Sequence, residues 1–235
     1  AYLSFKMGQR AKSILANVEG ARNILRLAET SRAHLFYVST AYLSGETTGR
    51  IREQELKEPS TWRNPYEETK FIAEREVHST CQQKKLSYTV FRPAILIGDS
   101  VSGRTIRFNS IYYFMKLFYQ YSQQERPSSI VLEAKPEATL NLLPVDVAIR
   151  AMWALSQSPR SLGKIFHITH PSPLTFRQLI SMAERIFGLS IQISGSSRVQ
   201  PGRRGADGEE TETALSLYAP YMFGEPEFDL TNTSS

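Results

Sequence analysis

Hydrophobic residues recur along the first part of the chain with two different periods. Between residues 7 and 29 they return every three or four positions, which predicts an amphipathic helix. Its apolar stripe consists of Ile14, Val18, Ala21, Leu25 and Ala28. The short apolar run 35–38 predicts a buried strand, 65–84 a second helix that starts at Pro65, and 88–91 a second strand. This alternation is typical of a parallel sheet with crossover helices.

After Gly98 the pattern becomes mixed. It predicts helices over 105–122, 145–155 and 175–187, and strands over 129–134, 139–143, 164–170 and 190–193. Residues 45–64 and 195–213 are polar, which predicts loops, and the second loop is expected to be mobile. Residues 218–229 are apolar enough to pack against the rest of the protein. We therefore expect an α/β protein. Residues 1–100 would form one domain and 101–235 a smaller mixed lobe, with about 139–157 returning to the first sheet.

Composition narrows the class without naming a function. The 235 residues are 41% hydrophobic and 22% charged, with a net charge of +5. Basic residues alternate with acidic ones, so a solvated mixed surface explains the charge better than a nucleic-acid partner does. No apolar run approaches the roughly 18 residues of a membrane span, and the first residues lack the pattern of a signal peptide. Cys81 is the sole cysteine, and the four histidines are scattered, which predicts a cytoplasmic protein without disulfides or a metal site.

The candidate chemistry begins at Tyr66 and Lys70, which lie four positions apart and would share one face of a helix. A nearby ammonium favours phenolate and would lower the pKa of the tyrosine from about 10. Such a tyrosine could act as a general acid toward a carbonyl oxygen that receives hydride.

The same spacing also occurs at residues 2 and 6 and at residues 112 and 116, so the spacing by itself proves little. Only the pair at Tyr66 opens a helix that lies between two predicted parallel strands. Only this pair follows a strand that ends in hydroxyl residues, Ser39-Thr40, with Gly45 behind them. Active sites of open α/β sheets lie at the carboxyl ends of the strands. We therefore interpret this pair as the catalytic one.

At this point the sequence resembles a known superfamily. Its motifs are Val38-Ser39-Thr40-Ala41-Tyr42-Leu43-Ser44-Gly45, Tyr66-x-x-x-Lys70, Phe91-Arg92-Pro93-Ala94, the helix Asn17–Leu25 and Leu143-Pro144-Val145-Asp146. Their kind and order resemble the extended short-chain dehydrogenases/reductases. The resemblance implies an α/β fold made of the C-terminal half of a Rossmann-type doubly wound parallel sheet plus a small mixed α/β substrate lobe.

The resemblance also implies roles for particular residues. Tyr66 would be the general acid/base, and Lys70 would lower its pKa and bind the nicotinamide ribose. Thr40 would be the catalytic hydroxyl, with Ser39 as second choice, and Asn17 would support the lysine, although a buried structural hydrogen bond explains Asn17 equally well.

Further residues would touch the cofactor. Pro93 and Ile95 would flank the nicotinamide through their backbone, and Ala1 would lie at the end of the preceding strand. The implied cofactor is NADP or NAD, with NADP the first choice. The residue that selects between the two is not in this sequence.

Within the superfamily, the stretch from Arg92 to Gly103 resembles the thioester-reductase and fatty acyl-CoA reductase (male sterility-type) branch. Sugar-nucleotide epimerases and dehydratases tend to have proline after the glycine, where this chain has Asp99. The aromatic helix 111–121 suits an apolar acyl chain, although it also suits ordinary core packing. The implied substrate is an acyl thioester on CoA or a carrier protein, and an oligomer is compatible with the sequence.

The chain contains no strand followed by Gly-x-x-Gly-x-x-Gly, the turn that meets the pyrophosphate in this superfamily. About four strands and their helices are expected upstream of residue 1. Without them, we expect an open sheet edge and weak or no dinucleotide binding by this chain alone.

Three functions remain open. The first is an NAD(P)H-dependent reductase, the second is a sugar-nucleotide epimerase or dehydratase with bound NAD, and the third is a non-catalytic remnant of the fold.

Overall fold

The structure is a computed structural model that describes residues 2–108, 110–124, 130–195 and 217–235. The chain forms two compact units, each assembled from separate stretches. The first unit comprises Ala1–Leu96, Leu143–Pro171 and Pro226–Ser235, and the second comprises Ile97–Leu142 and Ser172–Glu225. The candidate site residues that are described belong to the first unit.

The first unit is built on a parallel sheet of three strands in the order β1 (Leu35–Val38), β3 (Tyr88–Pro93) and β8 (Ile165–Ile168). β3 is the middle strand, and its residues pair in register with both neighbours, so that Phe91 lies opposite both Val38 and Phe166. Because the strands are parallel, their carboxyl ends meet at one edge of the sheet.

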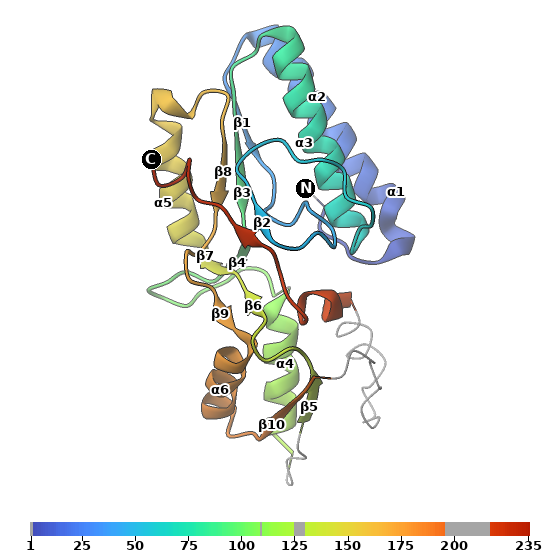
Figure 1. Cartoon of the computed structure of the whole chain (residues 1–235), viewed down its shortest axis with the longest axis vertical. Coiled ribbons are helices and arrows are strands. Elements are labelled where there is room, and N and C mark those ends of the chain that lie inside the picture. Colours follow the sequence, from blue (N-terminus) through green and yellow to red (C-terminus); the bar gives the residue numbers. More distant parts are fainter. Residues whose placement is uncertain (1, 109, 125–129, 196–216) are drawn as a thin grey trace. The chain divides into compact units, whose positions relative to one another are not determined.

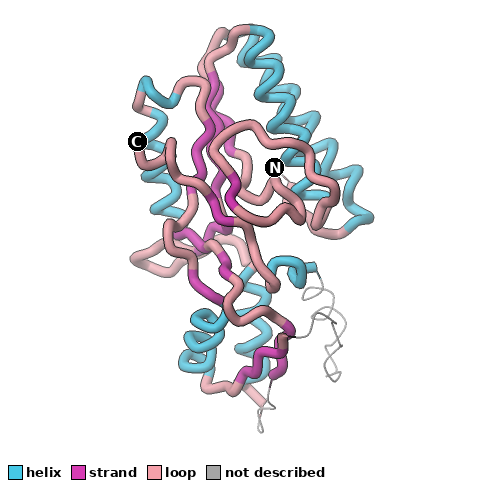
Figure 2. Tube along the Cα trace, viewed as in Figure 1, coloured by secondary structure: helices cyan, strands magenta, loops and turns pink. Residues whose placement is uncertain are grey.

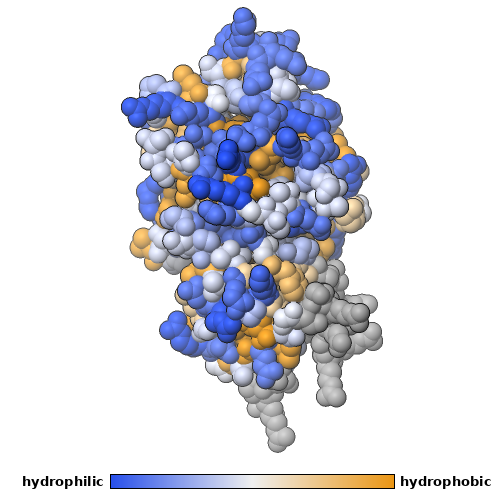
Figure 3. Space-filling model, viewed as in Figure 1, coloured by the Kyte–Doolittle hydropathy of each residue, from blue (hydrophilic) through white to orange (hydrophobic). Residues whose placement is uncertain are grey.

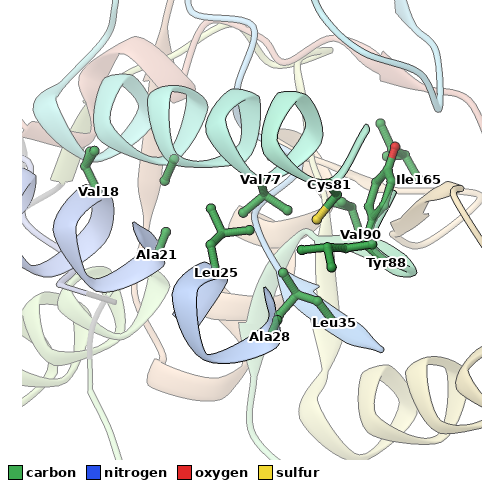
Figure 4. Packing of buried hydrophobic residues seen from close by; sticks show 12 residues of the cluster. Val18, Ala21, Leu25, Ala28, Leu35, Val77, Cys81, Tyr88, Val90 and Ile165 are labelled. Carbon is green, nitrogen blue, oxygen red and sulfur yellow. The ribbon is translucent and has the colours of Figure 1, made fainter. Parts of the chain in front are cut away.

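Helices cover both faces of this sheet (Figure 1). α2 (Gly20–Ser31) and α3 (Pro65–Lys84) pack on one face, and α5 (Val145–Ser156) packs on the other. Figure 4 shows the cluster beneath α2 and α3, in which Val18, Ala21, Leu25, Ala28, Leu35, Val77, Cys81, Tyr88, Val90 and Ile165 are buried. The α/β class and the parallel sheet predicted from the sequence are confirmed.

α3 begins and ends where its sequence predicts. The Asn64 side chain accepts a hydrogen bond from the Glu67 backbone N–H (3.0 Å), Pro65 fills the first turn, and the helix ends before Lys85 in the left-handed conformation (φ 52°). An N-cap acceptor and a proline at the first helical position are typical helix starts. The predicted range 65–84 is confirmed.

The stretch before it is less regular than the predicted single helix over 7–29. A 3-10 turn, η1 (Met7–Gln9), leads into α1 (Arg10–Ser13), then into the π-helical segment η2 (Ile14–Glu19) and finally into α2. A π turn contains more residues than an α turn, but hydrophobic residues that recur every three or four positions do not distinguish the two, so the pattern does not reveal it. Asn17 lies within it.

A long loop connects β1 to α3 and is drawn in pink in Figure 2. It contains only β2 (Arg50–Ile51), which pairs in parallel with β11 (Glu227–Phe228) from the end of the chain. Gly45 sits early in this loop at φ 54°, and a Cβ there would lie 2.0 Å from the Thr61 carbonyl oxygen. The loop therefore folds back on itself just ahead of α3.

The second unit contains α4 (Ile111–Ser122) and α6 (Phe176–Phe187), the parallel pair β5 (Ile130–Glu133) and β10 (Ile191–Ser194), the antiparallel pair β6 (Thr139–Leu140) and β9 (Leu174–Thr175), and the 3-10 turn η4 (Ala219–Tyr221). The remaining short elements are β4 (Ile95–Ile97), β7 (Leu142–Pro144) and η3 (Pro159–Ser161). α4 begins six residues later than its predicted start at 105, after Ser110 with a positive φ of 53°. The mobile loop expected at 195–213 lies, from residue 196 on, outside the described residues.

Hydrophilic residues cover much of the upper part of the face drawn in Figure 3, with hydrophobic residues between them. Several large apolar side chains of the first unit are nevertheless exposed, among them Phe36 (43%) and Val38 (49%) on β1. Among the described strands, β1 pairs only with β3. None of the described helices combines the length and the apolar character that crossing a membrane requires.

Candidate active site

The hydroxyl residues that follow β1 lie beside the end of β3. The backbone N–H of Ser39 donates to the Phe91 carbonyl (2.7 Å), and that of Ala41 donates to the Pro93 carbonyl (2.9 Å). The strand pairing therefore continues past β1 and fixes Thr40 between these two bonds. Ser39 and Thr40 are both buried.

α3 brings Tyr66 to the same place. The Tyr66 phenol lies near the Thr40 hydroxyl, and this interaction lowers the pKa of Tyr66. Burial has the larger effect and raises this pKa to about 12, with a smaller contribution in the same direction from Glu67. The pKa lowering expected from the sequence is thus absent here. A phenol of this kind keeps its proton at neutral pH and can donate it to a stronger base.

Lys70 explains this difference, because its ammonium points elsewhere. Its Nζ donates to the Val38 carbonyl (2.8 Å) and to the Tyr37 hydroxyl (3.2 Å). The side chain is buried, and burial lowers its pKa to about 8, partly offset by the negative charge of Glu74. Lys70 therefore lies one helical turn from Tyr66 but does not bind it directly.

The side chain of Asn17 forms hydrogen bonds with Tyr2 and with Thr69 of α3. Its Nδ2 donates to the Thr69 hydroxyl and to the Tyr2 carbonyl (3.0 Å each), and its Oδ1 accepts from the Tyr2 backbone N–H (2.6 Å). Thr69 precedes Lys70 on α3, so Asn17 links the π-helical segment to the helix that carries the candidate catalytic pair. Within the described residues, these hydrogen bonds of Asn17 do not reach Lys70.

Two buried hydroxyl groups at the carboxyl edge of the sheet have no hydrogen-bond partner within the described chain. They belong to Ser39, after β1, and to Thr169, after β8. A buried hydroxyl without a partner is costly, so it indicates a place where a ligand or water is received. This edge therefore fits a polar ligand at the end of the sheet.

Of the other three residues predicted to contact the cofactor, the structure describes Pro93 and Ile95 but not Ala1. Pro93 is the last residue of β3, is buried and lies next to Ala41. Ile95 follows in β4 and is partly buried. Ala1 lies outside the described residues. The structure thus brings Thr40, Tyr66 and the end of β3 together in the first unit.

Sequence reasoning missed the residue that contacts Lys70 from β1. The hydrophobic pattern predicts Tyr37 only as part of an apolar strand. In the structure its hydroxyl accepts a hydrogen bond from the Lys70 ammonium, and its ring centroid lies 4.6 Å from Nζ. The alternation of faces along a strand was the available signal, since Tyr37 shares the helix-facing side with Leu35. No cluster of three or more histidine, cysteine or acidic side chains suited to a metal occurs in the described part of the chain.

A parallel sheet with crossover helices on both faces and polar side chains at its carboxyl edge defines the α/β class of dinucleotide-binding folds. Residues 6–152, more than half of the chain, match the male sterility protein family, and the chain belongs to this NAD-binding family of extended short-chain dehydrogenases/reductases. The resemblance stated from the sequence is confirmed.

Relatives include the nonribosomal peptide synthetase asaC of Aspergillus flavus, which is 30% identical over an alignment of 171 residues, gaps included, that covers 67% of this chain and 16% of the synthetase. Among solved structures, the terminal R domain from the myxalamid PKS-NRPS biosynthetic pathway matches 99% of this chain and 59% of its own, with a TM-score of 0.80 and 24% identity. The aureusimine biosynthetic cluster reductase domain matches 94% and 57%, with a TM-score of 0.65 and 20% identity.

A different activity occurs on the same fold. The UDP-glucuronic acid 4-epimerase from Bacillus cereus in complex with NAD matches 88% of this chain and 67% of its own, with a TM-score of 0.59 and 17% identity. At these identities the structural matches establish the fold. This chain spans about a sixth of the Aspergillus synthetase and under two thirds of the R domain.

Proposed function

We propose that this chain carries the proton-transfer half of an NAD(P)H-dependent reductase that acts on an acyl thioester or a related carbonyl. The observation that carries the proposal is the placement of the Tyr66 phenol beside the Thr40 hydroxyl at the carboxyl edge of the sheet. A buried, protonated phenol beside a hydroxyl group can supply both a proton and a second hydrogen bond to one carbonyl oxygen.

The residues act in a simple order. The Tyr66 and Thr40 hydroxyls bind the carbonyl oxygen and polarise it. As the carbonyl carbon accepts hydride, negative charge develops on the oxygen, and the Tyr66 phenol transfers its proton there. When the substrate is a thioester, the C–S bond then breaks to give an aldehyde and a thiol. The Lys70 ammonium, one turn along α3, stabilises the phenolate that remains until solvent returns a proton.

The reduced nicotinamide ring of NADPH or NADH would supply the hydride when bound. Lys70 fits the ribose end of such a cofactor, because two of its three N–H groups are used by Val38 and Tyr37 and one remains. The unpartnered Ser39 hydroxyl lies at the same edge. Pro93 and Ile95 are proposed to flank the ring through their backbone, and Ala1 to lie at the preceding strand end. We propose NADP rather than NAD as the first choice.

The relatives support an acyl thioester as substrate. Two structural neighbours are a terminal R domain of a PKS-NRPS pathway and a reductase domain of a biosynthetic cluster, and the Aspergillus relative is a nonribosomal peptide synthetase. By this analogy we propose that the acyl group is presented on a carrier protein or on CoA. The apolar helix α4, with Phe114, Leu117 and Phe118 buried, adds a hydrophobic element to the second unit.

The likeness to an epimerase favours a second candidate, the rearrangement of a sugar nucleotide with bound NAD. Both candidates use the same tyrosine, so a substrate panel separates them. The panel would set acyl-CoA and carrier-bound acyl thioesters against UDP- and dTDP-sugars. NADPH and NADH oxidation is the readout for the thioesters, and chromatography of the products is the readout for the sugars, because a rearrangement with bound NAD consumes no added reduced cofactor. Oxidation with thioesters alone supports the first candidate, and turnover of sugars alone would replace it with the second.

The mechanism is tested by Tyr66→Phe in the natural polypeptide that contains this chain, with the 235-residue chain assayed beside it. Loss of a general acid lowers the rate roughly 10²–10⁴-fold. Tyr88→Phe is the matched control, because this tyrosine of β3 bonds to His78 (2.7 Å) away from the site. Full activity of the Tyr66→Phe protein would disprove the mechanism.

A further inference from the structure

Tyr37 lies on β1 with its side chain toward α3, where it packs against the core cluster of the first unit. It contacts Lys70 in two ways. The hydroxyl oxygen accepts a hydrogen bond from Nζ at 3.2 Å, and the ring centroid lies 4.6 Å from the same atom. The Val38 carbonyl, one residue further along the strand, is the second acceptor at 2.8 Å.

We propose that Tyr37 is a positioning residue for Lys70: its hydroxyl and ring hold the ammonium at the end of β1, where the amine can serve Tyr66 and a bound cofactor. This inference rests on the proposed function and extends it to a residue outside the motifs of the sequence. Tyr37 touches neither substrate nor cofactor in this scheme, and it acts through the lysine.

The physical need for such a residue follows from the burial of Lys70. An ammonium taken out of water requires acceptors, and burial otherwise drives it toward the neutral amine. The carboxylate of Glu74 acts on Lys70 from the same helix, but it gives limited help because it is paired with Arg92 at 2.5 Å. Removal of the tyrosine hydroxyl would leave the amine with the Val38 carbonyl and the aromatic ring.

The charges around the pair are few and identified. On α3 they are Glu74, Glu76 and the phenol of Tyr66, and on β3 there is the Arg92 guanidinium, which is bound to Glu74. Burial, and then the negative charge of Glu74, raise the pKa of Tyr37 well above its usual value. The Tyr37 phenol therefore stays neutral and remains an acceptor for the lysine across the working pH range.

The first test measures Lys70 directly, without cofactor or substrate. With lysine labelled at the ε-carbon, an NMR titration of the chain reports the pKa of Lys70, assigned through Lys70→Arg. In Tyr37→Phe, which keeps the ring, we expect this pKa to fall by about one unit from its value near 8. Tyr88→Phe removes a hydroxyl from the same sheet and should leave the Lys70 pKa unchanged. An unchanged pKa in folded Tyr37→Phe would overturn the proposal.

A second measurement covers the case in which Tyr37→Phe does not fold. In the wild-type chain, the Tyr37 ring protons should show a nuclear Overhauser effect to the ε-protons of Lys70, and its absence would also overturn the proposal.

Kinetics then separate positioning from mere structural support. In the natural polypeptide, kcat/KM for the reduced cofactor follows the pKa of the free enzyme. In a plot of this kcat/KM against pH, the pKa of the alkaline decrease should be about one pH unit lower in Tyr37→Phe than in wild type. At pH 7.5, kcat/KM should then be approximately threefold lower. A uniform decrease without a shift of the limb would contradict positioning. If the wild-type protein oxidises no NAD(P)H with any substrate, the proposed function fails, whereas the NMR titration still decides the contact between Tyr37 and Lys70.

Discussion

Gly45 is a single residue on which the placement of the site depends. It follows the hydroxyl pair by five positions, adopts φ 54°, and lets the Thr61 carbonyl approach to where a Cβ would stand. This approach closes the loop between β1 and α3. The Thr61 hydroxyl adds a hydrogen bond to the Glu46 carboxylate (2.9 Å). The loop therefore delivers the start of α3 to the strand that ends at Thr40.

We predict that Gly45→Ala destabilises the first unit by about 2–5 kcal/mol, because the left-handed backbone and the steric clash both disfavour a side chain. Gly49→Ala is the matched control: its φ is 86°, but nothing lies within 4 Å of the added Cβ. It should cost about 1–2 kcal/mol for the backbone conformation alone. Urea unfolding measures the free energy of unfolding of both variants. Equal losses in Gly45→Ala and Gly49→Ala would contradict the prediction, because they would show that the Thr61 carbonyl moves aside at no cost.

Lys70 should carry a measurable stability cost. Its pKa is about 8 in the folded protein against 10.5 for a free lysine, so the unfolded chain binds more protons between these values. Stability therefore rises with pH from about 8 to 10.5, and the cost of roughly 3 kcal/mol is present in full below pH 8. We predict that Lys70→Met has the larger free energy of unfolding below pH 8, and that its difference from wild type decreases by roughly 3 kcal/mol between pH 8 and 10.5. Lys84→Met, on the same helix and exposed, is the control, and a constant difference for Lys70→Met would contradict the prediction.

At the residue scale, the sequence predicted which side chains gather at the strand ends but not how they are bonded. Thr40 and Tyr66 meet because strand ends and helix starts are local features that sequence patterns reveal. The partner of Lys70 depends on which way a buried ammonium turns, and that is decided by the acceptors within reach. Tyr37 provides one, and no motif marks it.

At the element scale, α3 and β1 were predicted at their observed bounds, because each has local boundary signals in its own sequence. The π turn at Ile14–Glu19 and the late start of α4 at Ile111 were not predicted. Both are backbone adjustments that leave the spacing of hydrophobic residues almost unchanged. β1 was expected to be a buried strand, yet Phe36 is 43% exposed, because strand character does not say which faces are covered.

The pairing of β3 with β8 places two buried basic side chains opposite each other. Arg92 lies in register with His167, and its Nη1 contacts the His167 Nε2 at 3.4 Å. The other ring nitrogen lies 2.7 Å from the Asp229 carbonyl. Since Nδ1 must donate to the carbonyl and Nε2 must accept from the guanidinium, the imidazole is neutral. Burial and the Arg92 charge lower the pKa of His167 to about 4.

This arrangement predicts an acid-sensitive joint between β3 and β8. The pKa of His167 is about 4 when folded against 6.5 when free, so its contribution is complete above pH 6.5 and is lost as the pH falls toward 4. The loss should reach about 3 kcal/mol. In His167→Gln, the free energy of unfolding should therefore decrease by about 3 kcal/mol less than in wild type as the pH falls from 6.5 to 4. His170→Gln replaces an exposed histidine after the same strand, and an equal flattening by that control would contradict the assignment.

At the scale of the whole molecule, each unit is assembled from stretches far apart in the sequence, so its stability depends on long-range contacts. The end of the chain provides the longest of them. Beyond the pairing of β11 with β2, the Asn232 side chain donates to the carbonyl of Ile165 on β8 (3.0 Å) and to that of Glu53 (3.1 Å). The loop after β1, the third strand of the sheet and the last residues of the chain thus form one hydrogen-bonded joint. The sequence indicated only that this tail was apolar enough to pack.

Glu53 is the centre of that joint and gives the last prediction. Its buried carboxylate accepts the backbone N–H of His167 (2.7 Å), the hydroxyl of Thr233 (2.5 Å) and the backbone N–H groups of Thr233 (3.2 Å) and Asn232. Glu53→Gln keeps the shape but places an amide N–H₂ against some of these donors, which should cost about 3 kcal/mol. Glu58→Gln, in the same loop but exposed and paired with Arg75, should cost less than about 1 kcal/mol. Urea unfolding measures the cost, and faster amide exchange at His167 and Thr233 should accompany it. Equal costs for the two variants would show that the carboxylate does not fasten the end of the chain.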